Sequence, residues 1–250
     1  MYETYLDAVQ ALPGRIRAAN EATLPAVAEA CASSIAAHRA VFLFGSGHSI
    51  LPIMDLFPRY GGYTGYVPMM DPRLMWTTVA GSGGAEEVLW LERSEGYAAT
   101  YVMSHYPITA ADTVIVVSHG GLNAAPVEVA LGAKERGATV VAVTSGEGVK
   151  VSKPTHSSGK RIADIADFTL DNGVDPEDSQ VAVPGVPFKV GGLSTVGAMV
   201  VLHCVSVEVA SLLAGRGLEV LPFVSPNAPG VPAGHSAHVY DIYKAFIRSL

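Results

Sequence analysis

Short runs of apolar residues recur along the chain and predict the strands of a buried sheet. Four of them are almost wholly apolar and cover residues 41–44, 114–117, 140–143 and 168–170. None alternates polar with apolar positions, so both faces of each strand should be buried, which is typical of a parallel sheet covered by helices. A less regular run at 65–69 would bring the number of strands to five.

Helical patterns lie between these runs. Residues 22–38 and 123–136 carry apolar side chains at helical spacing, and Gly137 follows the second segment as a stop signal. Residues 196–214 form the longest apolar segment, which we interpret as a buried helix because it also contains His203 and Glu208. Strands that alternate with helices of this length indicate βαβ units in a doubly wound α/β fold.

The length of 250 residues fits one domain over 1–250. We expect N-terminal helices at 1–38, a sheet core at 39–215, and a C-terminal strap and helix at 216–250. Within the core, residues 171–192 are rich in proline and glycine and break the pattern. A connection this long is usually functional, or it is an arm that reaches a neighbouring subunit. The proline-rich strap could wrap over a neighbouring subunit or form a simple surface tail.

Composition narrows the class of protein. The chain has 16 Lys and Arg against 23 Asp and Glu, a net charge of −7, and only 16% charged residues against 49% hydrophobic ones. This balance excludes intrinsic disorder and argues against a nucleic-acid partner. Sparse charge leaves apolar surface that a second subunit could cover, so we expect a homo-oligomer.

The cysteines and the N-terminal sequence suggest a cytoplasmic protein. Cys31 and Cys204 cannot form a disulfide framework, show no metal-ligand spacing, and are interpreted as small core residues. No basic stretch followed by an apolar core is seen at the start, so we expect neither a signal peptide nor a membrane location. No His/Cys cluster has metal spacing, so neither a metal nor another cofactor is expected.

The segments that directly follow three of the predicted strands are small, polar and rich in glycine. Since ligands bind beyond the carboxyl ends of parallel strands, these loops are the first place to look for a site. Glycine lets an anion approach backbone N–H groups, and hydroxyls add donors, so three converging loops predict a phosphate site. Taken singly, each loop could simply cap a helix. The candidate ligand-binding residues are Gly45, Ser46, Gly47, His48, Ser49, Ser118, His119, Gly120, Gly121, Asn123, Thr144 and Ser145.

The kind of phosphate follows from what the loops lack. The motif that begins Gly45-Ser46-Gly47 has Ile50 where a dinucleotide fingerprint has its third glycine, and no P-loop lysine is present. A small phosphorylated metabolite fits better than a nucleotide. Ser194 and Thr195, at the start of the long apolar helix, either cap that helix or close the phosphate site from the far side.

Seven segments carry residues in a pattern typical of a known family: 41–49, 91–97, 116–128, 141–145, 156–160, 170–173 and 192–195. They resemble the SIS (sugar isomerase) domain family, in particular an uncharacterised bacterial branch related to phosphoheptose isomerases. The resemblance implies a three-layer α/β sandwich with a five-stranded parallel sheet of flavodoxin-like type, a phosphosugar ligand, and a homodimer or tetramer.

The chain departs from the family pattern at two positions. Gly120 stands where relatives usually carry a serine, and Leu122 stands where they carry a basic residue. A lost hydrogen bond to a charged group is worth about 1.5–3 kcal/mol. The departures could mean weaker phosphate binding, another substituent on the sugar, or a changed ligand.

Aldose–ketose interconversion needs a base and a group that assists ring opening. Glu92 and Glu95 lie three residues apart and would share one helix face, either as the base or as a solvated face with Arg93. His156 is our first choice as the assisting group. Asp55 is a weaker candidate.

Three other histidines have a functional and a structural interpretation. His48 and His119 lie in the predicted anion loops and could contact a ligand or cap a helix. His203 is interpreted as a satisfied core residue.

The sequence therefore favours a protein that binds a sugar phosphate or amino-sugar phosphate and isomerises it. A sugar-phosphate lyase or etherase, and a non-catalytic sugar-phosphate sensor, remain as alternatives. A Ser–His–acid hydrolase is disfavoured because no G-x-S-x-G elbow follows a predicted strand.

Overall fold

The expected parallel sheet is present in the computed structural model, which describes residues 1–56, 58–75 and 84–250. Its five strands run in the order β2-β1-β3-β4-β5, and all neighbouring pairs are parallel. Every residue of the two central strands β1 and β3 is buried, because both faces of the sheet are covered. The strands are β1 (Val41–Gly45), β2 (Tyr66–Met69), β3 (Thr113–Val117), β4 (Thr139–Thr144) and β5 (Phe168–Asp171).

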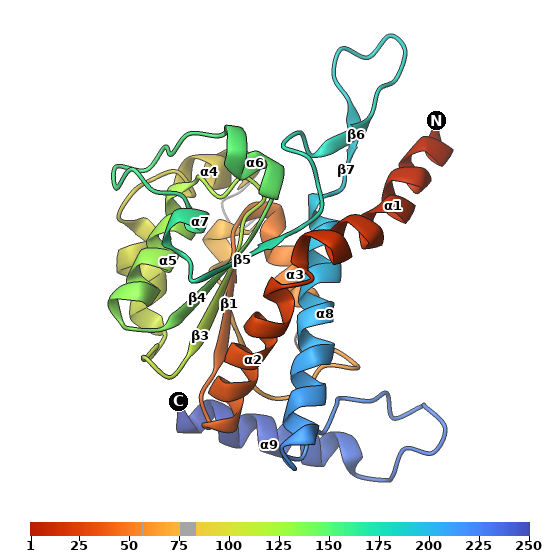
Figure 1. The fold of residues 1–250 in the computed structure, drawn as a ribbon. Helices are drawn as coiled ribbons and strands as arrows, with labels where there is room; N and C mark the ends of the chain where they lie inside the picture. Colours follow the sequence, from red (N-terminus) through yellow and green to blue (C-terminus); the bar gives the residue numbers. More distant parts are fainter. Residues whose placement is uncertain (57, 76–83) are drawn as a thin grey trace.

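Alternate residues of each strand enter two separate hydrophobic cores, which gives the three layers (Figure 1). Leu43 and Ile115 face one core, whereas Phe42 and Val114 face the other. The first core is covered by α1 (Tyr2–Asn20), α2 (Thr23–Ala36), α3 (Ile50–Leu56) and α8 (Ser194–Gly215). The second is covered by α5 (Ala124–Glu135), α7 (Ile162–Ile165) and the turns η4 (Ala98–Val102) and η5 (Met103–His105).

The other helical elements lie around this sandwich. At the carboxyl ends of the strands are η1 (Gly47–Ser49), which follows β1, and α6 (Gly146–Val151), which follows β4. The helix α9 (His235–Ser249) crosses beneath the amino ends of the strands (Figure 1). The remaining elements are η2 (Pro72–Leu74) and α4 (Gly84–Leu91).

The long apolar segment forms α8, whose length and composition would also suit a membrane-spanning helix. The core helix of a folded domain has the same features, and α8 packs against α2 and α3. Its most apolar window is 44% buried. The opposite face is open, since Val207 is 70% exposed and Cys204 is exposed as well. The expectation that both cysteines are core residues is therefore right for Cys31 and wrong for Cys204.

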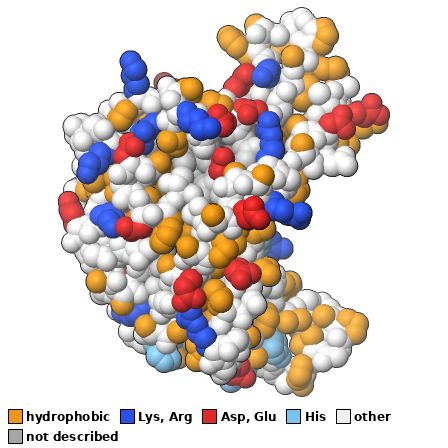
Figure 2. All heavy atoms as spheres, in the orientation of Figure 1, with side chains coloured by type: hydrophobic (Ala, Val, Ile, Leu, Met, Phe, Trp, Pro, Cys, Tyr) orange, Lys and Arg blue, Asp and Glu red, His pale blue; other side chains and the backbone are white. Residues whose placement is uncertain are grey.

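The segment that interrupts the pattern at 171–192 contains a small antiparallel hairpin outside the main sheet. Its strands are β6 (Ser179–Val181) and β7 (Val190–Gly192). The hairpin and the first half of α1 stand off the body together, and the hydroxyl of Tyr5 donates to the carbonyl of Gly192 at 2.9 Å. We call these two elements the arm. Figure 2 shows hydrophobic side chains along it, and Phe188 is 81% exposed.

Candidate functional site

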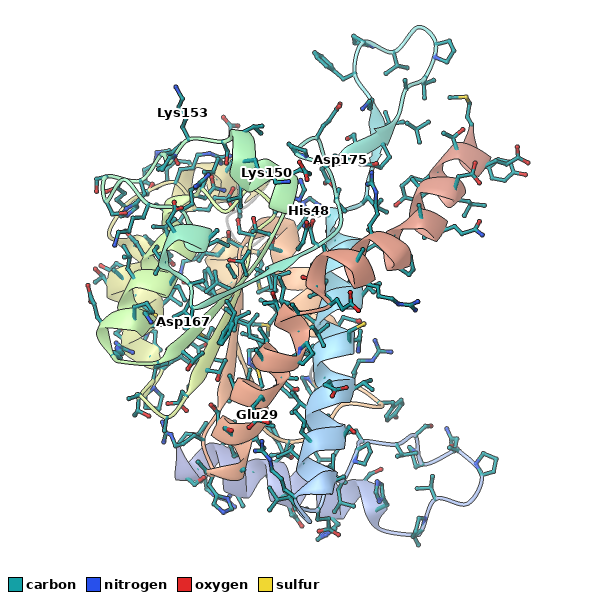
Figure 3. All side chains as sticks on the ribbon, viewed as in Figure 1. Glu29, His48, Lys150, Lys153, Asp167 and Asp175 are labelled. Carbon is teal, nitrogen blue, oxygen red and sulfur yellow. The ribbon has the colours of Figure 1, made fainter. Side chains whose placement is uncertain are left out.

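The strand order places a topological switch point between β1 and β3. After β1 the chain leads to β2 on one side of the sheet, and after β3 it leads to β4 on the other. Ligands of open α/β sheets bind at such a point, beyond the carboxyl ends of the strands. The loops 45–49 and 118–123 flank it, so the predicted convergence of these two loops is found. Figure 3 shows His48 and Lys150 at this end of the sheet.

The first loop turns back tightly on its own strand. A Cβ atom at Gly45 would lie 2.2 Å from the carbonyl oxygen of Ser49, closer than real Cβ atoms come, so only glycine fits. Gly47 has a φ of 56°, in the left-handed region that favours glycine. Both glycines therefore shape the turn that presents Ser46 and Ser49.

The first carboxylate of the site is Glu92, which is only 7% exposed. The hydroxyl of Ser46 donates to its Oε2 at 2.8 Å, and Arg93 lies 3.2 Å from its Oε1. The carbonyl of Glu92 also accepts from the N–H of Ala125 at 3.0 Å, which ties it to the start of α5. The alternative of a solvated surface residue is therefore wrong for Glu92.

Glu95 lies apart from Glu92, because α4 ends at Leu91 and both residues follow it. The expectation that they share one helix face is therefore wrong. Glu95 accepts from the N–H of Ser157 at 2.7 Å and from its hydroxyl, and these bonds lower the pKa of Glu95. His156 adds a smaller electrostatic contribution in the same direction.

His156 lies between two carboxylates. Its Nε2 is 3.7 Å from Oε2 of Glu95 and 3.8 Å from Oε1 of Glu128, and its side chain is 8% exposed. The N–H of Ser158 donates to Nδ1 at 3.1 Å, so in the neutral ring the proton is on Nε2, facing the two carboxylates. Glu95, His156 and Glu128 form a cluster distinct from the Ser46–Glu92 pair.

Glu128 is the residue of this cluster that sequence reasoning missed. It is 6% exposed on α5, and it accepts from the backbone N–H groups of Gly96 and of Ala99, the latter at 3.0 Å. The available signal was a single acid inside the otherwise apolar stretch 124–131. A charged residue in such a surrounding needs partners when it is buried.

The second loop is organised around His119. Its carbonyl oxygen accepts from the hydroxyl of Thr144 at 2.8 Å and from the N–H of Ser145 at 3.0 Å. Its Nδ1 lies 3.0 Å from Nδ2 of Asn172, whose Oδ1 accepts from the N–H of Val174. Because Oδ1 is held as an acceptor, Nδ2 must donate to Nδ1, and the neutral ring of His119 carries its proton on Nε2.

The Nε2 atom of His119 is buried and has no hydrogen-bond partner among the described residues. His119 lines a small cavity of about 10 Å³ together with Asn172, Ser49, Ser194 and Thr195. This volume holds about one water molecule. The three hydroxyls make no hydrogen bond with any residue in the described part of the chain. The cavity thus gathers donors from the loops after β1 and β3 and from the start of α8.

The start of α8 is partly occupied by protein. One carboxylate oxygen of Asp178 accepts from the N–H groups of Leu193 and Ser194, at 2.8 and 2.6 Å. A carboxylate at a helix N-terminus satisfies the unpaired backbone donors there. The side chains of Ser194 and Thr195 are not used by Asp178, and they line the cavity beside His119 and Ser49.

The third predicted loop supports the site from behind. Thr144 is completely buried, and its hydroxyl is bound to His119. The hydroxyl of Ser145 donates to the carbonyl of Val174 at 2.6 Å and caps α6 by accepting from Gly148. Both hydroxyls donate to backbone carbonyls, so Thr144 and Ser145 position other residues of the site, and contact with a ligand remains a prediction for them.

Among the other predicted residues of the second loop, Ser118 stabilises the turn, whereas Gly120 is exposed. The hydroxyl of Ser118 accepts from the N–H of Gly121 at 3.2 Å, so Ser118 stabilises the turn. Gly120 is exposed, and Asn123 begins α5 without a side-chain capping bond. The side chain of Asn123 makes no hydrogen bond with the described residues, so it remains available in this loop together with Nε2 of His119.

Asp55 and His203 pair with each other on the surface of α3 and α8. Oδ2 of Asp55 lies 2.8 Å from Nε2 of His203, and Arg59 lies 2.5 Å from Oδ1. The side chain of His203 is 42% exposed. The interpretation of His203 as a core residue is therefore wrong, and Asp55 already has two partners.

The chain belongs to the SIS domain family, whose profile matches residues 4–145. It is 33% identical over 228 residues to a UPF0309 protein of Brucella ovis, covering 91% of this chain and 90% of that protein. A UPF0309 protein of Shouchella clausii is 29% identical, with 94% of both chains covered. Among solved structures, a phosphoheptose isomerase of Neisseria gonorrhoeae is 15% identical with a TM-score of 0.49, covering 84% of this chain and 99% of that one.

Proposed function

We propose that this protein binds a sugar phosphate or amino-sugar phosphate at the switch point and interconverts its aldose and ketose forms. The observation that carries the proposal is the unpartnered Nε2 of His119 beside the hydroxyls of Ser49, Ser194 and Thr195. A buried N–H donor without a partner is costly, and a phosphate oxygen would satisfy it. The membership of the SIS domain family supports a phosphosugar as the ligand.

In this proposal the four side-chain donors hold the phosphate, and the cavity opens to admit it. Each donor makes a hydrogen bond to a charged acceptor, which is stronger than a neutral one. The neighbouring loop residues His48 and Gly47 line the approach from β1. Gly120, Gly121 and Asn123 do the same from β3.

Glu92 is the proposed base. Its carboxylate removes the proton from C2 of the open-chain aldose, which leaves an enediolate with its negative charge on O1. A proton then moves from O2 to O1, and the protonated carboxylate returns its proton to C1, which gives the ketose with its carbonyl at C2. Ser46 fixes the carboxylate through the 2.8 Å hydrogen bond to Oε2. His156, held near Glu95 and Glu128, is the group that assists ring opening by donating from Nε2.

Binding is tested by thermal shift with a panel of hexose, heptose and amino-sugar phosphates, with inorganic phosphate as a further probe. At least one compound should raise the melting temperature by mass action. Thr195→Val should lower the affinity for that compound by about 10- to 100-fold, which corresponds to the loss of one charge-assisted hydrogen bond. Thr100→Val, at an exposed position without side-chain bonds among the described residues, is the matched control. No shift with any compound would refute the binding proposal.

Catalysis is tested separately, by NMR detection of deuterium at C2 of a bound sugar phosphate in deuterated water. Wild-type protein and Glu87→Gln, an exposed change on α4, should exchange this proton. Glu92→Gln should bind the ligand but lose the exchange. Binding without exchange in the wild type would indicate a sensor, and full exchange in Glu92→Gln would refute the choice of base.

A further inference from the structure

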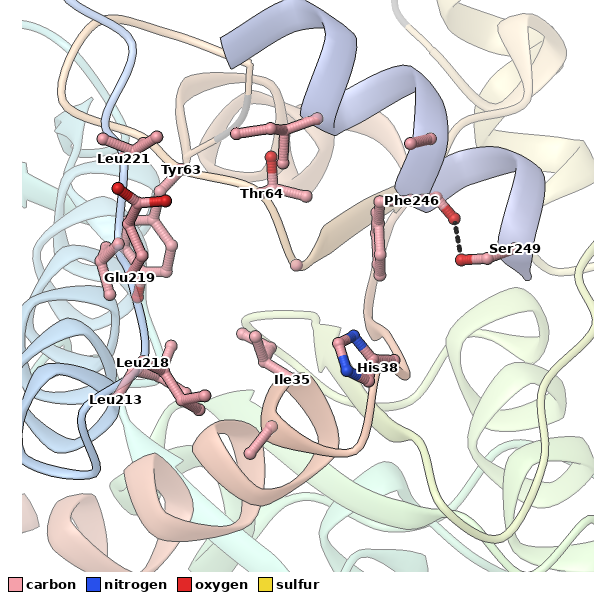
Figure 4. A pocket seen from close by; sticks show the side chains of 15 residues that line it. Ile35, His38, Tyr63, Thr64, Leu213, Leu218, Glu219, Leu221, Phe246 and Ser249 are labelled. Carbon is pink, nitrogen blue, oxygen red and sulfur yellow. Dashed lines mark hydrogen bonds between the residues drawn. The ribbon is translucent and has the colours of Figure 1, made fainter. Parts of the chain in front are cut away.

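A second and much larger cavity lies at the opposite end of the sheet, beneath the amino ends of the strands. It has a volume of about 580 Å³ and is lined by the end of α2, the turn before β2, the end of α8, the segment 218–221 and α9 (Figure 4). Ligand pockets usually measure about 300–1,000 Å³ and are mostly apolar with a few polar groups. The size of this cavity is that of a small-molecule site.

The walls of the cavity are mainly aliphatic and aromatic. Ile35 of α2, Leu213 of α8, Leu221 of the strap, and Ile242 and Phe246 of α9 all line it. In Figure 4 the side chains of Ile35 and Phe246 project toward its centre from opposite sides. Leu213 is already buried in the first core, but Ile35, Leu221, Ile242 and Phe246 are only partly buried, and an apolar molecule in this space would cover them.

The contacts of α9 show that its packing is incomplete. Only Val239 of this helix is fully buried, although the helix has an apolar face. Tyr240 packs its ring against Phe223 of the strap, with centroids 5.0 Å apart, and His235 bonds to the carbonyl of Pro222. The later turns are only partly buried: Tyr243 packs against the first core and Phe246 against the second, and the same turns also line the cavity.

The polar groups of the lining select the chemistry of a ligand. The hydroxyl oxygen of Thr64 is buried and has no hydrogen-bond partner among the described residues. Among the described residues the lining contains one acid, Glu219, and no lysine or arginine, and its other polar side chains include the imidazole of His38. A ligand anion would face the carboxylate of Glu219 and a chain of net charge −7, with this histidine as the one described lining group that could carry a compensating charge. A hydroxyl group on an uncharged molecule would satisfy Thr64 after rotation of the threonine side chain, whose oxygen points away from the centre of the cavity in Figure 4.

We propose that this cavity is a second binding site, for an uncharged apolar molecule of small to medium size that carries one hydroxyl group. Its apolar body packs against Ile35, Leu213 and Phe246, and its hydroxyl pairs with Thr64. The site is separate from the proposed phosphosugar site, at the other end of the strands, and does not depend on that proposal.

The proposal is tested with Nile red, an uncharged apolar dye, and with 2-naphthol as the competing ligand. The dye should bind saturably with one site per chain, and 2-naphthol should displace it. Ala245→Phe and Ala36→Phe fill the cavity from two different walls, and each should lower the affinity for the dye at least tenfold. Ala237→Phe, on the exposed side of α9, is the matched control and should leave binding unchanged.

The hydroxyl is tested by comparing 2-naphthol with naphthalene as competitors. Thr64→Val should lower the affinity for 2-naphthol by about 2- to 10-fold, which corresponds to the loss of one neutral hydrogen bond. The affinity for naphthalene should stay unchanged. Dye binding that persists in both cavity-filling variants, with folding verified by circular dichroism, would overturn the site. An equal effect of Thr64→Val on both competitors would overturn the choice of an alcohol.

Discussion

Replacing Thr144 with valine tests whether the end of β4 supports His119 rather than touching a ligand. The Thr144 side chain is completely buried, and its hydroxyl donates to the carbonyl of His119 at 2.8 Å. Valine has nearly the same shape but no hydroxyl. The carbonyl would keep its bond from the N–H of Ser145, so it would not be left unpaired. Only the net value of one hydrogen bond is lost.

That value is about 0.5–1.5 kcal/mol in the free energy of unfolding. For a chain of this size, a loss of 1 kcal/mol lowers the melting temperature by about 2–4 °C. Affinity for a sugar phosphate should change by less than about threefold, because Asn172 still orients the imidazole. Urea unfolding, with an unchanged m-value, measures the loss in the free energy of unfolding.

The matched control is Thr139→Val at the other end of the same strand. Thr139 is half-buried and makes no side-chain hydrogen bond with the described residues, so the change in stability should stay within about 0.5 kcal/mol. A Thr144→Val protein of wild-type stability whose sugar-phosphate affinity has fallen tenfold would refute the supporting role. It would place the Thr144 hydroxyl on the ligand instead.

Three further substitutions test other parts of the structure. Gly45→Ala forces the first loop to shift and should lower the free energy of unfolding by about 1–3 kcal/mol. Gly14→Ala is the control, because open space surrounds the added Cβ and the change should not destabilise the protein. Equal melting temperatures of the two variants would contradict the turn geometry. Asp112→Ala breaks a buried pair with Arg39 and should cost about 3–5 kcal/mol at neutral pH. Glu128→Gln leaves a backbone donor of the segment after α4 without its acceptor and should cost about 1–3 kcal/mol; an unchanged urea midpoint would contradict that role.

The cost of Asp112→Ala should depend on pH. Burial raises the pKa of Asp112, but hydrogen bonds from Arg39, Ala40 and Thr109 outweigh it and hold the pKa below its ordinary value. A lowered pKa in the folded state gives a stabilisation that is complete above the unfolded value, about 3.9, and is lost as the pH falls through the folded value. Urea midpoints of wild type and variant should therefore converge below about pH 4. A constant difference down to pH 2 would contradict this origin.

The sheet could be predicted from the sequence because its strands are buried on both faces. Runs such as 114–117 and 140–143 have no polar residue to place on a solvated face, and their lengths match the observed strands closely. The hairpin at 179–192 could not be predicted in the same way. Its strands have three residues each, and those of β7 are exposed, so no hydrophobic period marks them.

The loops that form the site could be predicted from the sequence, but the role of each side chain in them could not. Parallel strand ends necessarily meet at one edge, which placed Ser49 and His119 together. Whether a hydroxyl group positions another residue or remains available to a ligand depends on partners that are distant in sequence. The amide of Asn172, for example, reaches His119 from 53 residues away. Local spacing also suggested a helix through Glu92 and Glu95, whereas the chain leaves α4 before either residue.

The arm has a consequence for the order in which the chain acquires its structure during synthesis. Tyr5 finds its partner Gly192 only after 187 more residues have been made, and Arg15 reaches Asp175 after 160. At ribosomal rates of 5–20 residues per second, roughly 10–40 s separate the emergence of the two ends of the first contact. Leu12 and Ile16, both buried in the finished protein, pack beside Gly173, so they lack this neighbour until more than 150 further residues have been made. The nascent helix is therefore a candidate client of chaperones that bind apolar segments at the ribosome.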